Sequence, residues 1–213
     1  MEWYQYLSLG LTALPTIYLK VTGILYELWK FGLFLALVAW QGVVLLRQSL
    51  DKNKKYEAAT TFAAAAGKPL LVAGGPLGVT RHRRFFGVMA HGYGDVCLDI
   101  DPRAFDGCPC GVIADVRHIP FSDKSFGAVF ASHLLEHLPS VADAEKALAE
   151  LDRVAEAVFV AYPYRQSIVA WLIPSHLLWI WQKDGETYLK QRRWIQKLWA
   201  RNKPHPGRKK EHC

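Results

Sequence analysis

Short apolar runs alternate with helical patterns through the middle of the chain. The runs are continuously apolar and do not alternate with polar residues, which is typical of strands buried on both faces of a parallel sheet. Strands are expected at residues 69–74, 95–100, 111–115, 126–132 and 157–163, and helices at residues 79–92 and 141–155. This order predicts an α/β fold with a doubly wound, mostly parallel sheet covered by helices on both faces.

A different pattern occupies the N-terminal part of the chain. Residues 31–46 contain no charged side chain and lie between Lys30 and Arg47. A bilayer core requires roughly 20 residues of helix, but Lys and Arg side chains at both ends can reach the headgroups and extend a shorter segment. The segment is apolar on all sides, not along one stripe, so we predict a transmembrane helix and not a buried helix of a soluble domain.

The residues flanking this segment predict its orientation. Arg47 and residues 52–55 place four positive charges after it, whereas Lys20 and Lys30 precede it together with Glu27. Positive charge collects on the cytoplasmic side of spanning helices, so the globular domain is expected in the cytoplasm. The upstream residues 7–25 are also apolar but contain Pro15 and Lys20. A single-pass protein and one with a second, weaker membrane segment therefore both remain open.

The composition divides the chain into four parts. Residues 1–50 are expected to form the membrane-anchoring helices, and the alanine-rich residues 51–68 a linker helix that ends at Gly67. The α/β domain then occupies residues 69–165. Residues 166–213 are expected to form an interfacial segment followed by a basic amphipathic tail.

The C-terminal part holds the net charge of the chain. From residue 183 onward, ten Lys and Arg residues face three acidic ones, whereas the rest of the chain is balanced. Residues 167–181 contain three tryptophans, and residues 185–203 place basic residues around an apolar helical face, which predicts binding to membrane lipids. Core packing of the first segment and a solvated second segment are the alternatives. Nucleic acid is not an expected partner, because the basic residues form no known nucleic-acid-binding motif.

Candidate binding residues follow the first three expected strands of the sheet. Gly74, Gly75 and Gly78 form a turn after the first strand, where the backbone can approach a ligand closely. Asp99 ends the second strand and is suitably placed to accept hydrogen bonds from a ribose diol. Asp115 ends the third strand, where a carboxylate can meet an adenine amino group. The arrangement predicts a site for an adenosine-containing cofactor.

Residues 111–138 carry a more specific pattern, which reads GVIADVRHIPFSDKSFGAVFASHLLEHL. An aspartate ends a strand, Ile-Pro-Phe and Asp-Lys-Ser-Phe follow, and Leu-Glu-His-Leu comes after the next strand. This order resembles the central signature of class I S-adenosylmethionine-dependent methyltransferases, in particular the branch that includes ubiquinone and menaquinone methyltransferases. The resemblance extends over residues 69–163.

The resemblance implies a cofactor, a set of contacts and a reaction. The cofactor would be S-adenosyl-L-methionine, and His133, at the end of the fourth strand, would contact the substrate. The residues implied to hold the cofactor are Gly74, Gly75, Gly78, Asp99, Ile100, Asp115 and Val116. No metal site is expected. Together with the membrane segments, the resemblance implies a membrane-anchored methyltransferase with a lipid-like small-molecule acceptor.

Three departures from the family pattern support a second interpretation. Val72 stands where the first strand of the family carries an acidic residue, Pro76 replaces a glycine of the turn, and Gly127 replaces an aspartate. Pro76 also removes a backbone donor. The alternative is therefore a catalytically inactive methyltransferase-like subunit that serves as a scaffold in a membrane protein complex.

The cysteines add one expectation about the compartment. The four cysteines follow no regular spacing, so we expect reduced thiols in a reducing compartment. Cys108 and Cys110 could supply two thiolates to a metal, but no second pair completes a tetrahedral site.

Overall fold

The computed structural model describes residues 3–75, 92–105, 108–183 and 186–192. Contacts divide the chain into two units, Met1–Val43 and Val44–Cys213, which are treated separately below. The expected helix at residues 79–92 lies almost wholly outside the described residues.

Helix α1 spans Trp3–Ala65 and continues without a break through Pro15. Among the described residues, it is the one helix whose length and hydropathy would allow it to cross a bilayer. Its large apolar side chains between Tyr18 and Val43 are exposed. The first unit is therefore a single apolar helix with no core of its own among the described residues.

The end of α1 belongs to the second unit and has the features of a helix terminus. Gly67 adopts φ +64°, a left-handed conformation that glycine adopts without steric cost. The Lys68 amide donates a hydrogen bond to the Ala63 carbonyl at 3.2 Å, which closes the last turn. The chain then enters the sheet.

The described residues of the second unit form a five-stranded sheet in the order β3-β2-β1-β4-β5, in which every pair of neighbours is parallel. The strands are β1 (Leu70–Ala73), β2 (Val96–Asp99), β3 (Gly111–Ile113), β4 (Phe126–Ser132) and β5 (Ala155–Ala161). The strand order reverses between β1 and β4, so the carboxyl ends of β1, β2 and β4 surround the position where ligands bind in such sheets. The doubly wound, mostly parallel fold expected from the sequence is confirmed.

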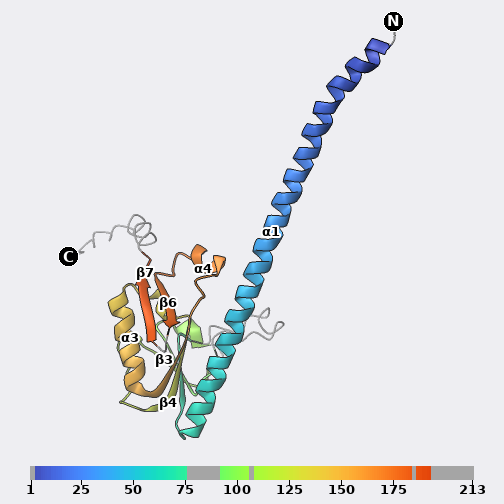
Figure 1. Cartoon of the computed structure of the whole chain (residues 1–213). Helices are drawn as coiled ribbons and strands as arrows, with labels where there is room; N and C mark the ends of the chain where they lie inside the picture. Colours follow the sequence, from blue (N-terminus) through green and yellow to red (C-terminus); the bar gives the residue numbers. More distant parts are fainter. Residues whose placement is uncertain (1–2, 76–91, 106–107, 184–185, 193–213) are drawn as a thin grey trace, which may run out of the picture. The chain divides into compact units, whose positions relative to one another are not determined.

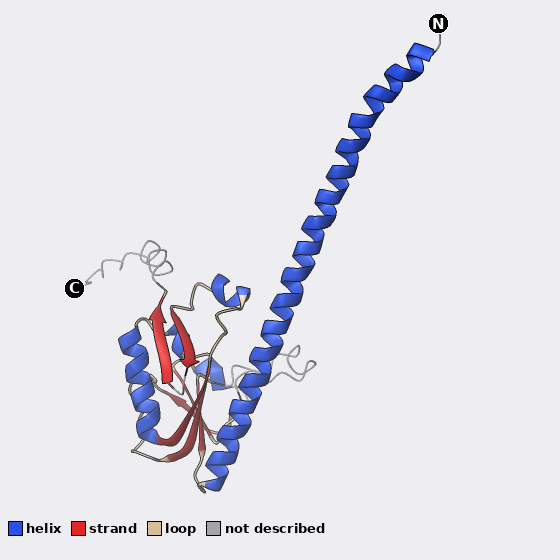
Figure 2. Ribbon diagram, viewed as in Figure 1, coloured by secondary structure: helices blue, strands red, loops and turns tan. Residues whose placement is uncertain are grey.

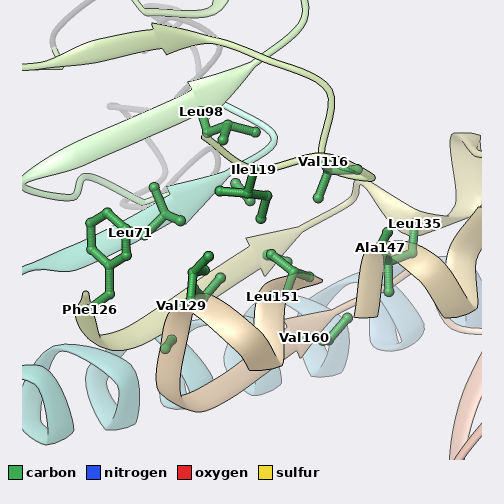
Figure 3. Packing of buried hydrophobic residues seen from close by; sticks show 14 of the residues in the cluster. Leu71, Leu98, Val116, Ile119, Phe126, Val129, Leu135, Ala147, Leu151 and Val160 are labelled. Carbon is green, nitrogen blue, oxygen red and sulfur yellow. The ribbon is translucent and has the colours of Figure 1, made fainter. Parts of the chain in front are cut away.

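Alternate side chains of each strand pack against helices on opposite faces of the sheet. Val72 and Phe130 face the C-terminal part of α1, where they pack with Ala59. Leu71 and Val129 face the other way and pack with residues of helix α3 (Val141–Val154). Figure 3 shows this second cluster, in which Leu151 of α3 lies beside Val129 and Ala147 of α3 lies beside Leu135. Burial of each such leucine or valine contributes about 1.5–3 kcal/mol.

A small antiparallel hairpin follows the sheet (Figures 1 and 2). It consists of β6 (Leu178–Lys183) and β7 (Glu186–Gln191), and the short helix α4 (Ile168–Leu172) precedes it. Leu178, Trp179 and Ile180 are buried, so this part of the tryptophan-rich segment packs in the core, while α4 exposes its apolar side chains.

The hairpin contradicts the C-terminal helix that was expected from the sequence. An amphipathic helix was expected over residues 185–203, but Glu186–Gln191 is a strand. Residues 186–191 pair with β6 in an antiparallel ladder, and the ring of Tyr188 stacks on that of Trp181 with the ring centroids 5.5 Å apart. Residues 193–213 lie outside the described part of the chain.

The cysteines differ from expectation as well. Cys97 in β2 and Cys108 form a disulfide with their Cα atoms 6.3 Å apart, so these thiols are not free. Cys110 is unpaired and exposed. The disulfide joins β2 to the segment before β3. The parallel pairing of β2 with β3 places the two cysteines close together.

Candidate functional site

The first element of the site is the turn after β1. Gly74 and Gly75 have φ values of +95° and +53°, and the Gly74 amide donates to the Leu98 carbonyl at 2.9 Å. A Cβ atom at Gly75 would lie 2.5 Å from the Cβ of Ala104, so no larger residue fits there. Gly78, also expected in this turn, lies outside the described residues.

The carboxylate of Asp99 faces this turn. Its Oδ2 lies 3.1 Å from the position that a Gly75 Cβ would occupy, and its Oδ1 accepts a hydrogen bond from the Asp101 amide at 2.8 Å. The backbone bond therefore fixes one oxygen while the other points to the glycines. Ile100 follows with its side chain 71% exposed, available to cover an apolar ring.

Asp115 lies beyond β3 and has an internal partner. The Arg117 guanidinium donates to both of its carboxylate oxygens and also to Asp143. Hydrogen bonds from Arg117 outweigh the effect of burial and lower the pKa of Asp115 to about 2. Asp143 is fixed in turn by Ser140, which caps α3. Asp115 is therefore ionised at neutral pH and rigidly held.

Val116 differs from the other expected contacts because its side chain is buried. It belongs to the core cluster between the sheet and α3, as Figure 3 shows. Only its backbone could contact a ligand. The structure thus brings Gly74, Gly75 and Asp99 together and places Asp115 and Ile100 at the ends of the adjoining strands.

His133 follows β4 directly and has an unusual backbone conformation. Its φ is +53°, which is uncommon for a residue with a side chain and is concentrated at functional sites. A Cβ at Gly74 would lie 3.1 Å from the Ser132 carbonyl oxygen and 3.2 Å from the Leu134 Cβ, so residues 132–134 pass beside the glycine turn. His133 is consequently close to the turn, and its contact with a substrate stays a prediction.

The His133 ring contacts a buried carboxylate. Its Nδ1 lies 3.1 Å from Oε1 of Glu136, which is only 1% exposed. Burial opposes ionisation of Glu136, but the hydrogen bond from His133 and the electrostatic effect of the neighbouring His133 and His137 rings outweigh it and lower the pKa of this carboxyl. Glu136 therefore carries a negative charge inside the protein.

Sequence reasoning missed one neighbour of this carboxylate. His176 is 5% exposed, and burial lowers the pKa of its imidazole to about 4 even though Glu136 acts in the opposite direction. Glu136, His137 and His176 each place one potential ligand atom within 4.8 Å of the others. The signal in the sequence is a histidine inside the apolar, tryptophan-rich residues 167–181.

The family departures at Val72 and Gly127 have packing explanations. Val72 is fully buried in the cluster that faces α1, where an acidic side chain would lack a partner. A Cβ at Gly127 would lie 2.8 Å from the Cα of Ala63, so close packing of α1 on β4 requires glycine there. Both residues therefore accommodate α1. Pro76 lies outside the described residues.

A separate pocket of about 430 Å³ lies at the other end of the strands. Lys68, Leu70 and Asp95 contribute to its walls. Asp95 accepts a hydrogen bond from the Leu70 amide at the start of β1. This pocket therefore lies at the amino ends of the strands, whereas Asp99 lies at a carboxyl end. It is not part of the candidate cofactor site.

Comparisons with known proteins agree with part of this description. Residues 88–157 match the family described as "Methyltransferase domain". Among solved structures, the crystal structure of the PH0226 protein from Pyrococcus horikoshii OT3 is similar, with 14% identity over 68% of this chain and 78% of that chain and a TM-score of 0.37. No curated protein matches. The matched residues begin after the glycine turn and end in β5, and over that range the chain is similar to a methyltransferase domain.

Proposed function

We propose that the chain is a membrane-anchored S-adenosylmethionine-dependent methyltransferase that acts on a lipid-like small molecule. The observation that carries the proposal is the pair formed by the Gly74-Gly75 turn and the Asp99 carboxylate at the switch point of the sheet. A nucleoside binds in this fold where glycines after one strand leave space for it. The next strand then ends in an acidic residue that accepts hydrogen bonds from the ribose. The similarity of residues 88–157 to a methyltransferase domain supports the same reaction.

The residues fit the adenosine half of the cofactor better than its amino-acid half. Asp99 would accept hydrogen bonds from the ribose hydroxyls, Ile100 would cover the adenine, and Asp115 would lie at its edge. The bound cofactor supplies a methyl group that is already activated on sulfur. Binding and orientation of the acceptor are then the main tasks of the protein.

His133 is the residue proposed to contact the acceptor. It lies beside the glycine turn, its backbone is held in the left-handed region, and Glu136 orients its ring. Because Oε1 of Glu136 lies beside Nδ1, a proton on Nδ1 is stabilised and Nε2 can accept a proton from an acidic acceptor group. The side-chain amide nitrogen of Gln48 in α1 lies 3.5 Å from Nε2 and donates to it, so the acceptor group would have to replace this contact.

The class of acceptor follows from the apolar surfaces of the chain. Helix α1 exposes apolar side chains over a length sufficient for a bilayer, and α4 exposes Ile168, Val169, Trp171 and Leu172. Apolar side chains with tryptophan are typical of segments at the membrane surface. A cofactor site anchored to a bilayer is best supplied with acceptors that partition into the bilayer, such as a quinone or another lipid. The globular unit is proposed to face the cytoplasm.

Cofactor binding can be measured directly. The full chain in detergent is titrated with S-adenosylhomocysteine by calorimetry. We expect one molecule to bind per chain, and Asp99→Ala to weaken binding at least about tenfold, because hydrogen bonds to a charged group contribute about 1.5–3 kcal/mol. Asp101→Asn is the matched control, since the Asp101 side chain is paired with Arg103 outside the turn. Absence of heat and of any melting shift at millimolar ligand would exclude the proposal.

A catalytically inactive subunit of a membrane complex is the second candidate. Val72 and Gly127 accommodate the packing of α1, so two of the three departures from the family pattern serve this packing. A chain that binds no cofactor and is isolated only together with partner subunits would favour this function.

A further inference from the structure

A buried carboxylate and two imidazoles meet outside the cofactor turn. Glu136 and His137 belong to the short helix η2 (Leu135–His137), and His176 lies 39 positions beyond His137 in the segment before β6. Their potential ligand atoms lie within 4.8 Å of one another, and the rings of His137 and His176 have centroids 5.0 Å apart. The cluster therefore joins two parts of the chain that are distant in sequence.

Two polar atoms of this cluster are buried without a hydrogen-bond partner among the described residues. They are Oε2 of Glu136 and Nδ1 of His176. A buried polar atom without a partner costs about 1–3 kcal/mol, and more when the group is charged. Both atoms are of a kind that can donate an electron pair to a bound ion.

Neighbouring groups already orient the cluster. The Ser175 carbonyl lies 3.1 Å from Nδ1 of His137, and because a carbonyl only accepts, Nδ1 carries the proton and Nε2 of the neutral ring keeps a free electron pair. Glu136 is held from two directions, since His133 binds its Oε1 and the Leu177 amide donates to its backbone carbonyl at 2.7 Å. Such contacts from surrounding residues fix the ligands at protein metal sites.

We propose that Glu136, His137 and His176 form a binding site for a divalent transition-metal ion, with zinc as the best match. Two imidazoles and one carboxylate are ligand types that zinc accepts, and three protein ligands leave a fourth position open. Glu136 and His176 are buried, whereas His137 is exposed, so the ion enters from the solvent side of His137. The open position takes a water molecule or an oxygen atom of a bound molecule.

The site requires neither S-adenosylmethionine nor the proposed reaction. Zinc binding is measured on the chain without cofactor, and cofactor binding is measured without zinc. Failure of one proposal therefore leaves the other intact, and the two outcomes can be distinguished on the same preparation.

The test is a zinc titration of the full chain in detergent, in competition with a chromophoric chelator. We expect Glu136→Gln, His137→Ala and His176→Asn each to lose one equivalent of bound zinc, or to bind it at least about tenfold more weakly. His118→Ala is the matched control, because His118 is exposed and contacts Lys146 away from the cluster. This variant should bind zinc like the unmodified chain.

His137→Ala decides the outcome if the buried variants fail to fold. His137 is exposed, so its replacement leaves the core intact, and comparison with the unmodified chain removes any contribution from other cysteines and histidines. Cobalt(II) gives a second readout, since a visible absorption band that is present in the unmodified chain should disappear in His137→Ala. Equal zinc stoichiometry and affinity in these two proteins would overturn the proposal.

Discussion

Gly75 and Gly67 both adopt left-handed backbone conformations, but only Gly75 is enclosed. A Cβ at Gly75 would lie 2.5 Å from Ala104, whereas a Cβ at Gly67 has no neighbour within 4 Å. We expect Gly75→Ala to lower the melting temperature more than Gly67→Ala. The second change costs about 1–2 kcal/mol for the backbone alone, and the first adds a steric clash.

The same pair separates stability from binding. Gly75→Ala should also weaken binding of S-adenosylhomocysteine in the calorimetric titration, because the new methyl group would displace the Asp99 carboxylate or the loop at Ala104. Gly67→Ala should leave binding unchanged. Equal binding by both variants would show that the turn does not contact the ligand.

Individual site residues differ in how far the sequence could predict them. Gly74, Gly75 and Asp99 follow buried strands, and the carboxyl ends of parallel strands meet at one edge of a sheet, so their proximity was predictable. His176 was not predictable, because its contact with Glu136 depends on how the segment before β6 folds back over η2. The ion pair between Asp115 and Arg117 was also not predicted from the sequence.

At the scale of elements, helix α3 is tied to the loop before β4 by one charged network. Glu150 accepts a hydrogen bond from the Ile119 amide, and Arg153 donates to Glu150, Asp123 and two backbone carbonyls. Hydrogen bonds from Arg153, opposed by burial and assisted by the Ile119 amide, lower the pKa of Glu150 to about 2. This carboxylate therefore stabilises the folded protein in its ionised form.

The lowered pKa of Glu150 predicts how the stability of the folded protein changes with pH. The folded pKa lies below the ordinary value of 4.5, so the stabilisation is complete above about pH 5 and is lost as the pH falls towards 2. We expect Glu150→Gln to lower stability by about 1–2 kcal/mol at pH 7. The difference from the unmodified chain should shrink at pH 3.

Melting temperatures measured across this pH range check the prediction. Glu145→Gln is the control, because Glu145 lies on the exposed side of the same helix. A loss of stability in Glu150→Gln that stays constant from pH 7 to pH 3 would show that the charge on Glu150 is not responsible.

The elements were predictable where local pattern and burial agree. The strands of the sheet coincide with continuous apolar runs, and β4 spans the full expected range from Phe126 to Ser132. The strand β7 was mistaken for a helix because its polar residues fit a basic helical face. Arg192 shows the reason: it is 2% exposed, donates to three backbone carbonyls and lies over the rings of Trp171 and Trp179. These contacts come from tertiary structure, which a local pattern does not contain.

At the scale of the whole molecule, the proposed function requires that the apolar helix α1 anchors the chain in a membrane. We expect the full chain to remain in the membrane fraction after alkaline carbonate extraction. The double change Leu37→Arg and Val38→Arg should release it, because each arginine costs about 2.5–3.5 kcal/mol in the middle of a spanning helix. Leu50→Arg, outside the uncharged run, should not. Extraction of the unmodified chain by carbonate would contradict the anchor.

The proposed activity of the chain is methyl transfer to a membrane-borne acceptor. The most direct measurement supplies the reconstituted full chain with methyl-labelled S-adenosylmethionine and a total lipid extract, and follows label in the organic phase. Methyl transfer to such an acceptor predicts labelled lipid with the unmodified chain and none with Asp99→Ala. A chain that binds S-adenosylhomocysteine but leaves the organic phase unlabelled would contradict it.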